Sequence, residues 1–499
     1  MKKILERAKN INILFLIMLG FIVYCLFTNF VNFDNDLWFI MATGRNILNN
    51  GIPHFDVLSM HSDYLIVTQQ WLTSVIYFFT ALKLGATGLA VLVSVISCAG
   101  IAVLYRYSKY LSKNTTITSL LLILYIYFFV KGFTTSRPQI LSYLIFTTEL
   151  FLTDRFINSK NKKYLYLLPI LSLLEINLHA SVWLLQFCFL GVFLIEFINK
   201  KEIRRPLLIT LIIMFISGLI NPYGINAITY VFKSYGINII NINIQEMATV
   251  SVEYFLGKVV LLTLFLVLFI SSLYKKIKLR YLLLLGGTCY LALSHYKSFP
   301  YYGIAFVITM SQLLSGVNLK DIYLNIVNKI KIKNVKNILV KLSTYSYKYL
   351  KLSLFVVVLI LFVESYQIVI KESNFDNPLE RVVANLKFDA KTYDVTVYTN
   401  FMDGGYLEWK GFKPYIDPRA DVFIKATNNK FDLLDEAFSL NTNANIKRFI
   451  RKYNFDYYIV DPEQDKYLYN YLKDEMSYKY KQIYRSYGDD DRALFKRIN

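Results

Sequence analysis

Long apolar segments recur along most of this 499-residue chain. Of its residues 55% are hydrophobic and only 18% are charged, so one soluble core could not bury the apolar surface. Several segments approach the roughly 20 residues that a helix needs to cross a bilayer. The sequence therefore predicts an α-helical integral membrane protein. The segments lie near 11–30, 70–84, 86–105, 117–131, 139–156, 163–176, 180–198, 206–220, 257–274, 280–294, 299–315 and 352–370.

The net charge of +20 is divided among separate clusters of Lys and Arg between the apolar segments. Because short loops rich in Lys and Arg stay in the cytoplasm, clusters in alternate loops indicate membrane topology and not a nucleic-acid-binding surface. They place the N-terminus inside and everything after residue 371 outside. The clusters lie at 2–9, 106–113, 160–163, 200–205, 275–280 and 320–351.

This alternation requires that residues 70–105 cross the membrane only once, although they hold two apolar segments. We expect 86–105 to span and 70–84 to lie at the outer interface. If both crossed, the cluster at 106–113 and every later loop would change sides. The prediction is a membrane module over residues 1–372 with about eleven transmembrane helices and a first outer loop at 31–85.

The composition changes after the last apolar segment, and residues 373–499 are polar and mixed. Five short strand-like runs alternate with helical stretches, which predicts a C-terminal extracytoplasmic α/β domain. Polar groups follow three of the strands, at Asn400, Asp417 and Asp461. They could line a ligand crevice, since ligands gather at the carboxyl ends of strands in open sheets, or they could simply form turns. The runs are 395–399, 414–418, 455–460, 481–485 and 493–497, with helices expected around 428–452 and 463–475.

Polar and ionisable side chains gather on the predicted outer face, several of them at the ends of apolar segments. An ionisable group at membrane depth costs about 2.5 to 3.5 kcal/mol, so such a set predicts a polar cavity that opens to the outside. Any single member could instead anchor the end of a span. The candidates are Asp34, Asp36, Asp56, Arg137, Asn177, His179, Glu246, His295 and Lys297.

Two acidic residues, Asp34 and Asp36, stand directly after the first apolar segment. In an extended chain, side chains two residues apart point the same way. Paired carboxylates can hold Mg²⁺ or Mn²⁺ together with a substrate phosphate, so a divalent cation at this pair is one hypothesis. The alternative is that Asn35 or Asp36 caps a helix over 37–49, which Gly51 ends.

The stretch DNDLWFIMATGRNILNNGIPHFD resembles the first outer loop of the GT-C superfamily. These are membrane glycosyltransferases that use polyprenyl-phosphate sugars, and they include the protein O-mannosyltransferases and the aminoarabinose transferases of lipid A. The motifs SRPQ, NLH, NPYG, GGYLEW and IDPRAD look like those of an uncharacterised bacterial branch. The resemblance runs through most of the chain and implies a GT-C-like fold, with the active site between the outer loop and the membrane.

The resemblance also implies roles for single residues. Asp36 occupies the position of the general base that acts on the acceptor, and Asp34 that of a second acid. Gln70 stands where related chains often carry Glu, which puts a second acid near it in doubt; Glu175 or Glu246 could supply one. Displacing a lipid phosphate also needs positive charge at the departing oxygen. The candidates for that charge are Arg137, His179, His295 and Lys297.

The sequence thus predicts a plasma-membrane glycosyltransferase of cell-surface glycan or glycoprotein synthesis. It would transfer a sugar from a polyprenyl-phosphate donor to an extracytoplasmic glycan, protein or lipid, with inversion expected from the resemblance. Two alternatives remain. A transporter or flippase of lipid-linked glycans predicts charged residues at mid-span along a path through the membrane. A non-catalytic cell-envelope assembly protein predicts that Asp34 and Asp36 are dispensable.

Overall fold

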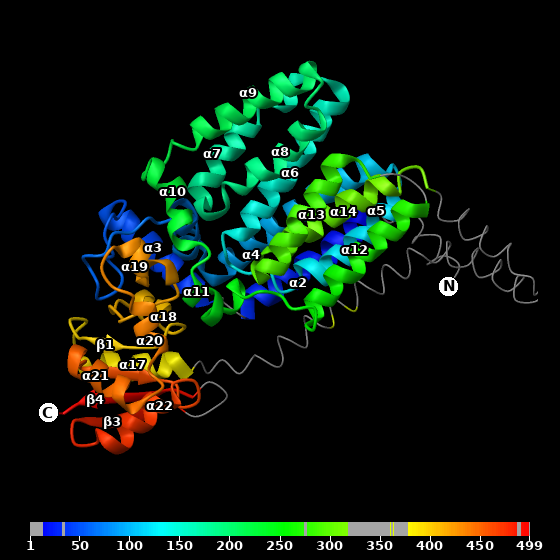
Figure 1. Ribbon diagram of the computed structural model, residues 1–499. Coiled ribbons are helices and arrows are strands. Elements are labelled where there is room, and N and C mark those ends of the chain that lie inside the picture. The colour runs from blue at the N-terminus through cyan, green and yellow to red at the C-terminus, as the bar shows by residue number, and fades with distance from the viewer. Residues whose placement is uncertain are drawn as a thin grey trace, which may run out of the picture.

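The protein consists of a helical body and a smaller C-terminal domain that contains a sheet (Figure 1). The computed structural model describes residues 13–31, 35–273, 277–317, 378–486 and 491–498, with the single residues Ile360 and Val363. Asp34, most of the predicted span at 352–370 and the predicted boundary at 372–373 therefore lie outside the described residues.

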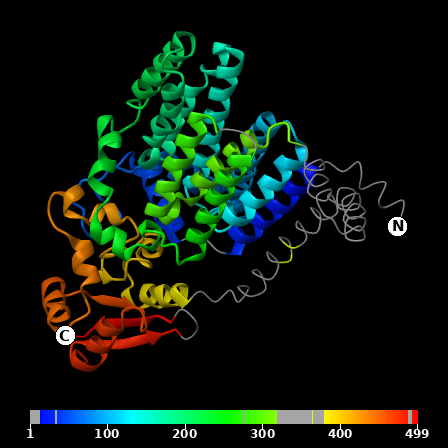
Figure 2. The same ribbon diagram turned by 45° about the vertical axis from the view of Figure 1, so that its right-hand side comes forward.

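The helices of the body follow the apolar segments of the sequence. In Figures 1 and 2, α7, α8 and α9 project from one end, beside the bundle that contains α2, α5, α12 and α14. The bounds are α2 (Ile13–Val31), α3 (Asn35–Asn50), α4 (Trp71–Ser112), α5 (Thr115–Tyr125), η1 (Ile126–Val130), α6 (Gln139–Ser159), η2 (Lys162–Tyr164), α7 (Leu168–Leu178), η3 (Ala180–Val182), α8 (Leu185–Glu196), α9 (Lys201–Ser217), α10 (Ile225–Ser234), α11 (Asn238–Asn243), η4 (Gln245–Met247), α12 (Phe255–Leu273), α13 (Leu279–Ser294), η5 (Tyr296–Ser298) and α14 (Phe299–Leu313).

Two of the described helices, α4 and α12, are long and apolar enough to cross a membrane by length and composition. Shorter apolar helical segments lie at Ile17–Thr28, Thr115–Val130, Ala180–Glu196 and Leu279–Ser294. The number of crossings, predicted as about eleven, and their direction stay predictions.

Helix α4 is interrupted at Gly85, whose backbone has φ 68° and ψ −170°. This conformation is open to glycine because it has no Cβ. The interruption separates 71–84 from 86–112, which agrees with the division of this region into two apolar segments. Asn114 ends the connection that follows, and its side chain accepts hydrogen bonds from the first turn of α5.

The C-terminal domain is built on a four-stranded sheet in the order β1-β2-β4-β3. Strand β1 pairs parallel with β2, and the other two pairings are antiparallel. The run at 414–418, predicted as a strand, makes only a single bridge, Val397 to Pro414, because its two prolines cannot donate to a ladder. The bounds are α17 (Pro378–Ala390), β1 (Val397–Tyr398), α18 (Gly404–Lys410), η6 (Ala420–Phe423), α19 (Lys425–Asn428), α20 (Leu433–Phe438), α21 (Asn443–Tyr453), β2 (Tyr457–Val460), α22 (Lys466–Asn470), η7 (Tyr471–Glu475), β3 (Tyr480–Arg485) and β4 (Ala493–Arg497).

The apolar core of the C-terminal domain extends into two connecting segments of the body. Tyr64 and Ile66 from the segment between α3 and α4, and Ile240 and Met247 from the segment between α10 and α12, are buried in the same cluster as Tyr415. Burial of apolar surface contributes roughly 25 cal/mol per Å², so a shared core stabilises the contact between the two parts. The C-terminal domain is therefore packed onto these two segments, which the sequence predicts to lie on the outer side.

Candidate active site

A cavity of about 420 Å³ lies where connecting segments of the helical body meet the C-terminal domain. Its walls come from α3, from the segments around residues 137, 179 and 297, and from residues 418–422 of the C-terminal domain. Most of the other lining side chains are apolar, as in typical sites for organic ligands. Five of the predicted site residues line it, namely Asp36, Arg137, His179, Glu246 and Lys297.

Asp36 lies in the first turn of α3, where a carboxylate is favoured by the helix dipole. Its side chain is 27% exposed, and its Oδ2 lies 3.3 Å from Nη2 of Arg137. The other guanidinium nitrogen, Nη1, forms an ion pair with Glu246. Arg137 therefore joins the two carboxylates on one side of the cavity.

The sequence SRPQ places Arg137 two residues before α6, which begins at Gln139 with Pro138 at its N-cap position. The hydroxyl of Tyr77 donates to the carbonyl oxygen of Arg137 at 3.2 Å, which fixes the turn. Lys297 adds a second cation from η5. Burial lowers the pKa of Lys297, and the nearby Glu246 opposes this shift. Two cations and two carboxylates of the helical body thus line one cavity, together with Arg419 and Asp421 of the C-terminal domain.

His179 is held by a chain of hydrogen bonds that leads away from the cavity. Its Nδ1 lies 2.7 Å from Oγ of Ser142, and that hydroxyl donates to Oε1 of Glu175 at 2.6 Å. The backbone N–H of His179 also donates to the carbonyl of Glu175 at 2.7 Å. Because Nδ1 is engaged, Nε2 is the ring nitrogen left for a ligand.

Three predicted residues are not among those that line the cavity. His295 lies against Tyr235, with Nδ1 2.9 Å from the phenol oxygen, and so supports a lining residue. Asn177 accepts a hydrogen bond from Nε1 of Trp71 at 2.9 Å and donates to two backbone carbonyls. The buried Asp56 pairs with Arg419 at 2.8 Å. The polar atoms of Asn177 and Asp56 are therefore satisfied within the protein.

Asp421 is a lining residue that the sequence reasoning missed. It lies in η6, directly after the Asp-Pro-Arg turn. Burial raises the pKa of Asp421, and a hydrogen bond from Tyr230 opposes this shift. The IDPRAD motif, which contains Asp421, was the feature of the sequence that could have pointed to this residue. However, the sequence could not show that a residue of the C-terminal domain reaches the cavity.

The hypothesis of a divalent cation rests on Asp34 and Asp36. Among the residues that the structure describes, no three His, Cys, Asp or Glu side chains are grouped so that they could hold a metal ion. Arg137 provides positive charge at Asp36, so a cation there would have to compete with the guanidinium. Removal of divalent cations tests the hypothesis.

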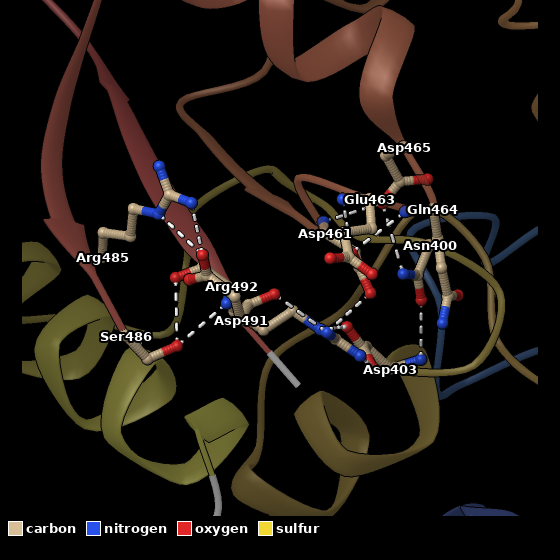
Figure 3. Close-up of polar contacts among 10 residues, drawn as sticks. All are labelled: Asn400, Asp403, Asp461, Glu463, Gln464, Asp465, Arg485, Ser486, Asp491 and Arg492. Carbon is tan, nitrogen blue, oxygen red and sulfur yellow. Dashed lines mark hydrogen bonds and ion pairs between the residues drawn. The ribbon is translucent and has the colours of Figure 1, made fainter. Parts of the chain in front are cut away.

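The polar groups that follow the strands of the C-terminal domain pair with one another. Figure 3 shows Arg492 between Asp403 and Asp461, at 2.6 and 2.7 Å. Asp461 also accepts hydrogen bonds from the backbone N–H groups of the next turn, and Asn400 accepts one from Asp403. These contacts favour the interpretation of this region as turns over that of a ligand crevice.

Comparison with known proteins gives matches only at the level of structure. No family model and no curated protein matches the sequence. The structure of ArnT from Cupriavidus metallidurans bound to undecaprenyl phosphate is similar, with a TM-score of 0.59 at 10% identity, over 96% of this chain and 97% of that one. The chain has the GT-C fold.

Two further solved structures agree with this assignment of the fold. The apo oligosaccharyltransferase of Archaeoglobus fulgidus has a TM-score of 0.57 at 10% identity, over 90% of this chain and 70% of that one. AglB of the same organism, in complex with an inhibitory peptide and a dolichol-phosphate, has a TM-score of 0.57 at 11% identity over the same shares. The GT-C resemblance of the sequence motifs is therefore confirmed for the fold.

Proposed function

We propose that this GT-C protein is a membrane glycosyltransferase that transfers a sugar from a polyprenyl-phosphate donor to an extracytoplasmic acceptor. The observation that supports the proposal is the meeting of Asp36, Arg137 and Lys297 at one cavity in a chain with this fold. Such a transfer needs a base for the acceptor and cations for the departing phosphate. The cavity supplies both.

Asp36 is the proposed general base. It takes the proton of the acceptor group as the acceptor atom forms a bond to the anomeric carbon of the sugar. The bond between that carbon and the phosphate oxygen breaks, and the phosphate leaves with the electron pair. A single displacement of this kind inverts the anomeric centre. The ion pair with Arg137 favours the ionised form of Asp36, which is the form that can accept a proton.

Arg137 and Lys297 are the proposed ligands of the phosphate. A guanidinium can bind two phosphate oxygens at once, whereas an ammonium acts as a point charge. Glu246 pairs with Nη1 of Arg137 and Asp36 lies near Nη2, so the guanidinium is placed before the donor enters. His179 would donate or accept through Nε2 at the same cavity. The proposed transfer does not require a divalent cation on Asp34 and Asp36, because Arg137 and Lys297 supply positive charge.

The proposed orientation in the plasma membrane follows from the charged loops. The N-terminus lies in the cytoplasm, and the cavity and the C-terminal domain lie outside. The donor lipid can then keep its chain in the membrane while its phosphate reaches Arg137. Polar acceptors approach from the aqueous side.

The test is transfer from a panel of radiolabelled polyprenyl-phosphate sugars by purified protein in liposomes, with membrane extract as the source of acceptors. Positioned general bases contribute about 10²- to 10⁴-fold, so Asp36→Asn should lower transfer at least a hundredfold. Asp63→Asn is the matched control, because Asp63 is an exposed acid of the same loop. Equal transfer by wild type and Asp36→Asn would refute the assigned base. No transfer by the wild type from any donor would refute the function.

One cluster of buried charges within the helical body gives no support to the transporter alternative. In this cluster, Arg280 pairs with Asp154 at 3.1 Å and with Glu196 at 2.5 Å. The hydroxyls of Tyr107 and Tyr281 also donate to Asp154. Charges that are satisfied in one closed cluster join helices together and do not form a path for a substrate.

A further inference from the structure

Helix α3 carries the proposed base and is packed between the membrane body and the C-terminal domain. On the body side, an added Cβ at Gly44 would lie 2.1 Å from the carbonyl oxygen of Ser74, so α3 and α4 are in direct backbone contact. Leu37 and Ile40 are buried in the same cluster as Tyr77 of α4. This face of α3 is fixed by packing.

The opposite side of α3 meets α18, the helix formed by the GGYLEW motif. An added Cβ at Gly405 would lie 3.3 Å from the backbone nitrogen of Phe39 and 3.4 Å from the carbonyl oxygen of Asn35. Both atoms belong to the start of α3, on either side of Asp36 in the sequence. The first turn of α3 is thus in close contact with the start of α18.

The far end of the same contact is a helix terminus capped by an arginine. Arg45 of α3 donates from Nη1 to the carbonyl of Trp409 at 2.9 Å and from Nη2 to that of Glu408 at 2.8 Å. Its guanidinium lies 5.0 Å from the centre of the Trp409 ring. The carbonyl of Glu408 also accepts a hydrogen bond from the N–H of Gly411 at 3.1 Å. Carbonyls in the last turn of a helix carry negative partial charge, so a cation stabilises them.

An aromatic contact lies between these two ends. The ring centre of Trp38 is 5.1 Å from that of Tyr406, edge to face, and 6.5 Å from that of Trp409. Trp38 follows Asp36 by two residues. Helix α18 therefore contacts α3 at its start, at its middle and at Arg45.

Helix α18 is also tied to the wall of the cavity. An added Cβ at Gly404 would lie 2.0 Å from the carbonyl oxygen of Ile416, so α18 cannot shift independently of the segment that follows. Arg419 of that segment forms an ion pair with Glu408 of α18 at 3.1 Å. Residues 418–422 then line the cavity that Asp36 faces.

We infer that the C-terminal domain is a positioning element of the active site, and that Arg45 and Gly405 are positioning residues for Asp36. The inference rests on the proposed function and assigns a role in it to the C-terminal domain. Docked α18 fixes the first turn of α3, so the carboxylate of Asp36 stays at its distance from Arg137. Loosening this contact lowers the rate of the chemical step and leaves the affinity for the donor unchanged, because the phosphate ligands lie on other segments.

The test compares Arg45→Ala, Arg45→Lys and Gly405→Ala with wild type in the transfer assay, at varied donor concentration. Arg45→Ala should lower kcat ten- to a hundredfold with the KM for the donor within threefold, and Arg45→Lys should recover part of the loss through one hydrogen bond. Gly405→Ala should lower kcat at least fivefold, because the methyl group pushes on the first turn of α3. Gly287→Ala is the control, since nothing lies within 4 Å of its added Cβ.

The outcomes separate this inference from the proposed function. Transfer by wild type and its loss in Asp36→Asn establish the function first. If Arg45→Ala and Gly405→Ala then keep more than half of the wild-type kcat, the inference is wrong. It is also wrong if KM rises in step with the fall in kcat. Thermal unfolding of each variant shows whether it is folded. If Arg45→Ala is not folded, the kcat of Gly405→Ala alone tests the inference.

Discussion

Replacing Arg419 with Gln should weaken the contact between the C-terminal domain and the segment between α3 and α4. Arg419 pairs with Asp56 at 2.8 Å, with Asp417 at 2.6 Å and with Glu408 at 3.1 Å. All three carboxylates are completely buried, whereas the guanidinium is 10% exposed. Burial would raise the pKa of Asp56, but Arg419 and hydrogen bonds from Ser59 and Leu58 outweigh it and lower this pKa. The arginine thus keeps Asp56 ionised.

The expected loss of stability follows from the buried carboxylates that would lose their ion pair with Arg419. Removing one partner of a buried ion pair costs about 3 to 5 kcal/mol, because the other charge stays buried without compensation. Protonation of Glu408 limits the cost, since burial and Asp417 already raise the pKa of Glu408. We therefore expect a loss near the lower limit, about 3 kcal/mol. For a domain of this size, that corresponds to a fall of roughly 10 °C in the unfolding temperature.

The measurement is denaturant unfolding in detergent micelles, followed by tryptophan fluorescence. Trp38 and Trp409 lie at the contact between the two parts, 6.5 Å apart, and report on its loss. Lys430→Ala is the control, because the ion pair of Lys430 with Asp63 joins the same two regions at the surface. An exposed pair contributes about 0 to 1 kcal/mol. If Arg419→Gln lies within 1 kcal/mol of Lys430→Ala, the buried cluster does not hold the domain.

Three further predictions concern other groups. Ser142→Ala removes the hydrogen bonds that link Glu175 to His179 and should lower the rate of transfer about tenfold. Ser159→Ala, at an exposed serine, should not change this rate. Equal rates for the two variants would show that His179 does not depend on the hydrogen bond from Ser142. Chelation with EDTA should leave the rate of transfer within twofold of the untreated rate, because Arg137 and Lys297 supply the positive charge at the phosphate. A tenfold loss of rate that added Mg²⁺ restores would establish a requirement for a divalent cation. Burial raises the pKa of Asp465 to about 6, above its value of roughly 3.9 in the unfolded chain. Between these two values the folded protein holds the proton more tightly than the unfolded chain does. The free energy of unfolding of the C-terminal domain should therefore fall by about 2 kcal/mol as the pH rises from 4 to 6. Unfolding of Asp465→Asn at these pH values should show no such fall, and an equal slope in both proteins would contradict the assignment.

The sequence predicted the parts of the structure that depend on local pattern. The apolar segments predicted the positions of the helices. The interruption of α4 at Gly85 falls between 70–84 and 86–105, the two segments that the pattern of charged loops distinguished. Sorting polar residues by side of the membrane brought Asp36, Arg137 and Lys297 together correctly. Loop charge and hydropathy are read along the chain, so they predict which side of the membrane a residue reaches.

Pairs of residues that lie far apart in the sequence could not be predicted in this way. Asp56 was predicted to face the cavity, but Arg419, 363 residues later, neutralises it. Asn177 was predicted there as well, but it bonds to Trp71. Asp421 was missed because its position depends on how the C-terminal domain packs. Exposure and charge at these positions are decided by tertiary contacts, which a single sequence does not contain.

The contact between α3 and α18 has a consequence for biogenesis. Residues 35–50 leave the ribosome early, whereas residues 404–423 follow some 370 positions later. At about 5 to 20 residues per second, roughly 20 to 70 seconds separate the two. We expect that the nascent helical body, even when inserted, has an open and incomplete site until the end of the chain has been exported. A truncated or half-translated protein should therefore not consume donor lipid, so synthesis and activity are coupled without any additional inhibitor.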